Sequence, residues 1–202
     1  ARPESAGALM TACWQREFGE HCAPEIVSAS HAAPELADQD ANLFLIGSGK
    51  VNPVTERFLR EMQRGQDPGW CLEPAPGERS SGDYEVRLIG RLGSEEFTTP
   101  VGVGSGAGGR DDFGLILRGP HPRYPKRSVT IMAGPHSLGT GAACLAATKP
   151  HLVSEIGKAL TGNVDLTARD RALWVLVKAE ATPDDHVDES RVSRTCRVAS
   201  RS

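Results

Sequence analysis

Runs of apolar residues, bounded by glycine, proline and polar residues, divide this chain into short elements. The run from Asn42 to Gly47, NLFLIG, is apolar without alternation, which is typical of a strand buried on both faces of a sheet. Similar runs from Phe113 to Gly119, from Ser128 to Gly134 and from Ala172 to Glu180 predict three further strands. The segment from Tyr84 to Leu92 alternates apolar and polar residues and predicts a half-exposed strand.

A helical pattern follows the first of these strands. In NPVTERFLREMQR, Asn52 is a natural N-cap, Pro53 suits the first helical position, and Glu56 stands roughly where a capping box has its acid. The buried stripe of this helix is expected to consist of Val54, Phe58, Leu59 and Met62. Further helices are predicted from Ala142 onward and over His151 to Leu160. The Pro/Gly-rich stretch from Gly65 to Asp83 predicts a surface loop.

The order of these elements indicates the fold class. Strand and helix alternate twice, with extra strands between and after, which predicts an α/β domain: three-layer, Rossmann-like, with a mostly parallel sheet and some antiparallel additions. We expect a single domain over 1–202. In it, 1–41 supply a helix and a short strand, 42–160 form the core with two strand–glycine loop–helix units, and 161–202 supply terminal strands.

Composition and charge exclude several classes. The formal net charge is −3 and the pI about 6.1, so this chain alone carries no electrostatic footprint for nucleic acid. No apolar run reaches the roughly 18 residues of a membrane span, and the N-terminus does not resemble a signal peptide. The chain does not begin with Met, which leaves room for a partner domain upstream. The five cysteines are odd in number, widely spaced and without a CxxC pair, which favours reduced thiols in a cytoplasmic protein.

Two glycine-rich segments stand where a predicted strand meets a predicted helix. They are GSGKVN, from Gly47 to Asn52, and GPHSLGTG, from Gly134 to Gly141. Backbone N–H groups at a helix start attract anions, so the two segments predict the halves of an anion or phosphate cradle. Neither matches the P-loop or the complete dinucleotide-binding fingerprint, and tight turns alone would also explain them. The candidate ligand-binding residues are Gly47, Ser48, Gly49, Lys50, Asn52, Arg118, His136, Ser137, Gly139, Thr140 and Gly141.

Side chains for catalysis are sparse. His136 is a candidate base or phosphate ligand, although a turn histidine bonded to its own backbone is an equally good interpretation. Glu56 is the second catalytic candidate, but its capping role already explains it. Arg118 is expected to reach the same sheet edge. The histidines are dispersed, so no metal site is predicted, and no cofactor is indicated.

Two further segments border on these candidates. The Pro-rich segment that holds His121, Arg123 and Arg127 is a candidate wall over the site, or else an ordinary solvated loop. Asp111 and Asp112 precede a predicted strand. Asp112, Phe113 and Gly114 spell the DFG motif of protein kinases, but no other kinase element accompanies it.

Three segments together resemble a known type of domain. NLFLIGSGKVNPVTERFL, DDFGLILRGPHPRYPKRSVTIMAG and GPHSLGTGAACLA are similar to a poorly characterised Rossmann-like domain of bacteria, which often follows a helix-turn-helix or another signalling module. The similarity covers roughly Asn42 to Leu160 and implies a sensory or effector-binding domain. No helix-turn-helix is evident in this chain.

Three functions follow as hypotheses. The first is a sensor domain that binds a small phosphorylated or nucleotide-like ligand at the two glycine-rich segments. The second is a nucleotide or nucleoside hydrolase, or a glycosyl transferase, that uses the same cleft with His136 or Glu56. The third is a protein-interaction domain. The absence of a closely spaced acid–base pair favours the sensor.

Overall fold

The computed structural model describes eleven parts of the chain. They are residue 35 and the ranges 38–49, 51–63, 70–74, 88–92, 95–98, 111–134, 137–159, 172–181, 187–194 and 200–201. Three helices are α2 (Pro53–Gln63), α3 (Ser137–Thr148) and α4 (Pro150–Ala159). The strands are β1 (Leu43–Ile46), β2 (Trp70–Pro74), β3 (Leu88–Leu92), β4 (Glu95–Thr98), β5 (Asp111–Pro120), β6 (Ser128–Ala133), β7 (Ala172–Ala181), β8 (Val187–Arg194) and β9 (Ser200–Arg201).

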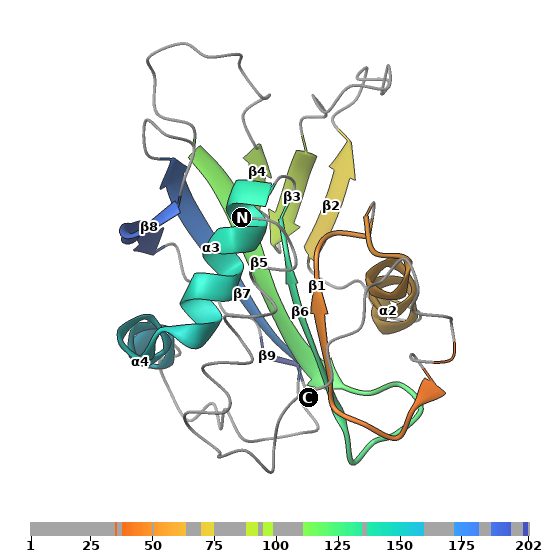
Figure 1. The fold of residues 1–202 in the computed structure, drawn as a ribbon. Coiled ribbons are helices and arrows are strands. Elements are labelled where there is room, and N and C mark those ends of the chain that lie inside the picture. The colour runs from red at the N-terminus through yellow and green to blue at the C-terminus, as the bar shows by residue number, and fades with distance from the viewer. Residues whose placement is uncertain are drawn as a thin grey trace.

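The main sheet is mixed, and the prediction of a mostly parallel sheet is wrong for its described strands. The strand order is β1-β6-β5-β7-β8, with β9 also paired to β7 (Figure 1). Among the described strands of this sheet, only β1 and β6 run parallel, and the pairs β5–β6, β5–β7, β7–β8 and β7–β9 are antiparallel. The connection from β5 to β6 explains this, because the short segment 121–127 cannot make the crossover of a dozen or more residues that parallel neighbours need.

Helices cover both faces of this mixed α/β sheet. On one face, Val54 and Phe58 of α2 join a buried cluster with Leu45, Leu117 and Ile131. On the other face, the small residues of α3 and the apolar side of α4 pack on the sheet in a second cluster, whose strand members are Ile116, Met132, Val175 and Val177. Successive residues of each central strand therefore enter opposite cores, which explains why these strands read as continuous apolar runs.

The predicted start is correct for α2 and wrong for α3. α2 has the predicted N-cap at Asn52 and the predicted first residue, Pro53. α3 begins at Ser137, five residues before the predicted start at Ala142. Gly139, Thr140 and Gly141 are therefore helical residues and not part of a loop. The glycines lowered the expected helical propensity of this segment, but contacts with the sheet outweigh it.

A second sheet holds β2, β3 and β4 in antiparallel order. Its first strand lies inside the stretch predicted to be a surface loop, so that prediction is wrong for Trp70–Pro74. The prediction of a strand at Tyr84–Leu92 is confirmed for Leu88–Leu92, and residues 84–87 lie outside the described residues. The helix and strand expected before residue 35 lie outside the described residues.

Candidate functional site

The two predicted strand–helix units do meet at one edge of the sheet. β1 and β6 are parallel neighbours, with Ile46 opposite Met132, and the Gly47 N–H continues the pairing by donating to the Met132 carbonyl at 2.9 Å. The chain leaves both strands at this edge, which we call the carboxyl edge. From there α2 packs on one face of the sheet and α3 on the other. Neighbouring parallel strands whose helices diverge in this way form a topological switch point, the place where open α/β sheets bind ligands.

The segment from Gly47 to Asn52, here the β1–α2 loop, is a tight turn. Gly47 has a φ of 104°, a left-handed conformation that favours glycine. The Ser48 carbonyl accepts hydrogen bonds from the N–H groups of Val51 at 3.1 Å and Asn52 at 2.9 Å. Val51 projects outward and is 64% exposed. Lys50 lies outside the described residues.

Asn52 ties the end of β1 to the start of α2. Its Oδ1 accepts the N–H groups of Val54 at 3.0 Å and Thr55 at 3.2 Å, and its Nδ2 donates to the Ile46 carbonyl at 3.2 Å. The Glu56 N–H donates to the Asn52 backbone carbonyl at 3.1 Å. The first-turn amides of α2 thus donate to Asn52. The structure assigns to this residue the shaping of the loop and the capping of the helix.

The start of α3 is occupied by a side chain that the sequence interpretation set aside. Asp112, at the beginning of β5, accepts the Gly139 N–H on Oδ2 at 2.7 Å and the Phe113 N–H on Oδ1 at 2.9 Å. Asp112 is only 3% exposed. The sequence predicted an anion from a ligand at this helix start, and the group that lies there is a carboxylate of the same chain.

The glycines at this helix start allow backbones to touch. A Cβ added to Gly139 would lie 2.1 Å from the Phe113 carbonyl oxygen, and one added to Gly114 would lie 2.2 Å from the Gly139 carbonyl oxygen. A Cβ on Gly134 would lie 2.5 Å from the Thr140 nitrogen. These three glycines therefore serve the contact between α3 and the strands.

Arg118 does not reach the carboxyl edge, so that prediction is wrong. β5 runs antiparallel to β6, with Arg118 opposite Thr130 and Leu115 opposite Ala133. Asp112 is the residue of β5 that lies at the carboxyl edge. Arg118 is six residues further along the strand, a distance of about 20 Å at the usual rise per residue.

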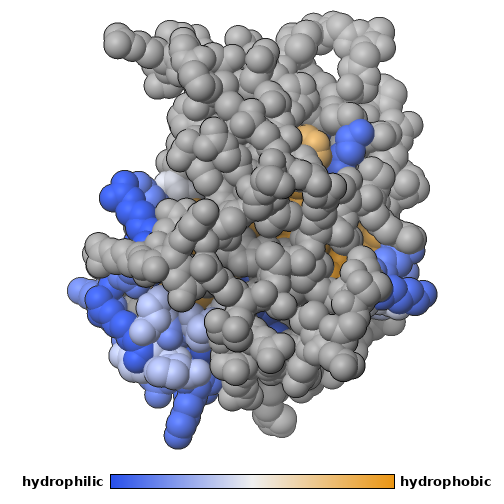
Figure 2. Space-filling view, turned by 180° about the vertical axis from the view of Figure 1, so that it is seen from behind, coloured by the Kyte–Doolittle hydropathy of each residue, from blue (hydrophilic) through white to orange (hydrophobic). Residues whose placement is uncertain are grey.

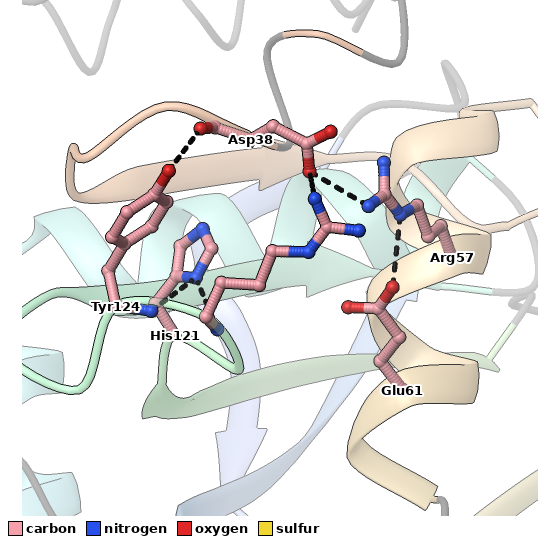
Figure 3. Close-up of polar contacts among 6 residues, drawn as sticks. Asp38, Arg57, Glu61, His121 and Tyr124 are labelled. Carbon is pink, nitrogen blue, oxygen red and sulfur yellow. Dashed lines mark hydrogen bonds and ion pairs between the residues drawn. The ribbon is translucent and has the colours of Figure 1, made fainter.

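The candidate wall also lies at the opposite edge. Figure 3 shows Asp38 between Arg57 of α2 and residues of the β5–β6 connection. Asp38 forms ion pairs with Arg57 at 2.9 Å and with Arg123, and its carbonyl accepts the Tyr124 hydroxyl at 2.6 Å. We call Asp38, Arg57, Arg123 and Tyr124 the Asp38 cluster. It fastens the segment that precedes β1 to α2 and to the connection before β6.

The buried histidine beside this cluster is a structural residue. His121 is 1% exposed, and its Nδ1 accepts the backbone N–H groups of Arg123 at 3.1 Å and Tyr124 at 3.3 Å. Its ring packs edge-on against Phe58, with 5.2 Å between centroids. Arg127 pairs with Asp40 at 2.8 Å. The described surface at this end is hydrophilic, as the lower left of Figure 2 shows.

Opposite charges lower two carboxyl pKa values at this end. Burial acts to raise the pKa of Asp38, but the hydrogen bond from Arg57 and the charges of Arg123 and Arg57 outweigh it and hold that pKa below its usual value. The hydrogen bond from Arg127 lowers the pKa of Asp40, against a smaller opposing effect of desolvation.

Of the remaining candidate residues, one lies in α2, three lie in α3 and one lies outside the described residues. Glu56 is the fourth residue of α2, one place beyond the capping-box position, and it pairs with Arg60 in the next turn. Its predicted capping role is therefore wrong, while its backbone lies against Gly49 at the carboxyl edge. Ser137, Thr140 and Gly141 lie in the first turns of α3. His136 lies outside the described residues.

Other chemistry finds little support in the described ranges. No three His, Cys, Asp or Glu residues gather there as a metal site would require. Cys144 is buried in α3, and desolvation raises its pKa to about 11, so it is a core residue and a poor nucleophile. The described helices include none with the length and apolar character to cross a membrane.

Comparisons of the chain with protein-family models, with curated proteins and with solved structures find no match.

Proposed function

We propose that this chain is a sensor domain that binds a small, nucleotide-like molecule at the carboxyl edge, between the β1–α2 loop and the start of α3. The observation that carries the proposal is the arrangement of β1 and β6 as parallel neighbours whose helices pack on opposite faces. In such sheets the crevice outside the strand ends is the usual ligand site. The resemblance of these segments to a Rossmann-like domain of bacteria, which implies a sensory or effector-binding role, points in the same direction.

The geometry divides the candidate residues into supporting and contacting groups. Asn52 and Gly139 shape the edge, because their polar backbone and side-chain groups already bond within the chain. Ser48 and Gly49 lie on the turn itself, and Lys50 follows them in the sequence. We propose that these three residues, together with His136 and Ser137 on the α3 side, contact the ligand. Lys50 then supplies the charge for a phosphate group.

The first experiment is thermal unfolding of the full chain against nucleotides, nucleosides, dinucleotides, sugar phosphates and inorganic phosphate. A ligand at about one hundred times its Kd should stabilise the fold by about 2.7 kcal/mol and raise Tm by a few degrees. Lys50→Ala should weaken this stabilisation at least tenfold in Kd. The control, Lys126→Ala, removes the same charge from an exposed site at the opposite edge and should leave Kd unchanged.

Two results would count against the proposal. One is a panel in which no compound raises Tm, and the other is equal affinity in the wild type and the Lys50→Ala variant. Analysis of the bound compound after prolonged incubation then separates sensing from catalysis, because a sensor returns its ligand unchanged.

A further inference from the structure

We infer that Asp112 fills the anion position at the start of α3 from within the chain, and so makes this side of the proposed site selective against negatively charged groups. The inference rests on the proposed function, since it states how a ligand at the carboxyl edge is oriented. A phosphate would lie beside the β1–α2 loop, where Lys50 follows Gly49. A neutral or cationic part of the ligand, such as a sugar or a base, would face α3.

The Asp112 carboxylate already occupies the start of α3. The N-terminus of a helix carries a partial positive charge and amides without partners inside the helix. In α3 the amide of Gly139, in the third helical position, donates to the Asp112 carboxylate at 2.7 Å. The Asp112 carboxylate therefore already accepts the hydrogen bond that a ligand phosphate would be expected to accept.

The backbones of α3 and β5 are in close contact beside Gly139. The space beside Gly139 is closed on the strand side, because even one added carbon atom would lie 2.1 Å from the Phe113 carbonyl oxygen and 2.9 Å from Asp112 Oδ2. The same contact is closed from the strand, where a Cβ on Gly114 would lie 2.9 Å from the Ala143 nitrogen. α3 and β5 thus pack backbone against backbone beside the Asp112 carboxylate, so an anion could approach the start of α3 only from outside this contact.

The buried carboxylate of Asp112 also disfavours a second anion at the start of α3. Asp112 is 3% exposed, so water screens its charge poorly. A second anion at the first turn of α3 would lie a few ångströms from this carboxylate, and like charges at that distance disfavour each other. Groups that donate hydrogen bonds without a negative charge do not meet this repulsion. The position of Asp112 therefore discriminates between the two ends of a ligand that has one phosphate end.

The test uses inorganic phosphate as the probe and backbone amide NMR signals of residues 138–141 as the readout, on the full chain. The main variant is Asp112→Asn, which keeps a side-chain oxygen to accept the Gly139 N–H and removes the charge. The control is Asp40→Asn, the same change at an exposed residue of the opposite edge. We expect no saturable shift in the wild type or in the control, and phosphate binding at least about tenfold tighter in Asp112→Asn.

The inference is overturned by a saturable phosphate shift of these amides in the wild type, or by an Asp112→Asn variant that responds no more than the wild type. If Asp112→Asn fails to fold, Asp112→Ser offers a smaller neutral acceptor, and the wild-type titration alone can still contradict the inference. Because the probe is phosphate itself, this outcome is independent of the ligand panel. A panel without stabilising compounds would count against the proposed function only.

Discussion

The backbone of Gly139, in the first turn of α3, lies against the backbone of Phe113 in β5, so closely that a Cβ on Gly139 would sit 2.1 Å from the Phe113 carbonyl oxygen. These residues are 26 positions apart in the sequence. Their contact sets the distance between helix and sheet, and it brings the Gly139 amide within 2.7 Å of Asp112. The same contact explains the glycine, because there is no room for a Cβ at this position.

Replacement of this glycine should destabilise the fold strongly. In an isolated helix Gly139→Ala would gain up to about 1 kcal/mol, because alanine has the higher helical propensity. The clash with Phe113 should outweigh that gain and lower the free energy of unfolding by about 3 kcal/mol or more, as measured by urea denaturation. Gly49→Ala is the matched comparison, since its Cβ would meet the Glu56 Cβ at 3.0 Å, and about 1 kcal/mol should be lost there. Equal stability of wild type and Gly139→Ala would contradict the packing described.

A buried hydroxyl in α2 gives the opposite prediction. Thr55 is 0% exposed, and its Oγ1 has no hydrogen-bond partner among the described residues. Thr55→Val keeps the size of the side chain and removes the cost of burying this group, so unfolding should require about 1 kcal/mol more free energy.

Thr148→Val is the control for this change. The Thr148 Oγ1 donates to the Cys144 carbonyl at 2.7 Å, so the same substitution removes a hydrogen bond there and should be neutral or destabilising. Urea denaturation of both variants measures the difference. A loss of stability in Thr55→Val, equal to that in Thr148→Val, would show that the Thr55 hydroxyl is satisfied in solution.

The Asp38 cluster predicts a loss of stability in acid. The folded pKa of Asp38 lies below its usual value, and the unfolded pKa is about 3.9, so the carboxylate stabilises the fold fully above that value. The contribution is lost as the pH falls from about 4 through the folded pKa. Urea midpoints between pH 7 and pH 2.5 should fall more steeply for the wild type than for Asp38→Asn. Parallel curves for the two proteins would show that the ion pairs with Arg57 and Arg123 contribute nothing in solution.

Burial should protect Cys144 from thiol reagents. With a pKa of about 11, only about one thiol in a thousand is ionised at pH 8, and the residue is 2% exposed. Peptide mapping after alkylation should show Cys144 modified only at the rate at which the chain unfolds. In urea above the unfolding midpoint the same peptide should react quickly, which serves as the control. Rapid labelling of the folded protein would contradict the burial of α3 against the sheet.

The sequence alone determined the local parts of this protein. Asn52 and Pro53 mark the start of α2 because capping depends on residues within one turn of each other. The apolar run at Ser128–Ala133 marks a strand buried on both faces, because burial of both faces removes the alternation. The run at Leu43–Ile46 also marks a strand, but Phe44 is 38% exposed, so the prediction of burial on both faces is wrong for β1, which ends the described strand order. The meeting of the two strand–helix units at one edge agrees with the predicted role of their glycine-rich segments as two halves of one site, but the direct pairing of β1 with β6 was not predictable from the sequence.

Tertiary structure decided the direction of β5 and everything that depends on it. Because β5 runs antiparallel to β6, Asp112 comes to the carboxyl edge, and Arg118 and His121 go to the other. The alternation within a strand does not carry that direction, because it is the same read either way. The short connection 121–127 does favour an antiparallel pair, but the prediction of a mostly parallel sheet did not take it into account. The sequence predicted an anion site for a ligand at the start of α3. Only the packing of β5 against α3 shows that the Asp112 carboxylate lies there, because that contact joins residues 27 positions apart.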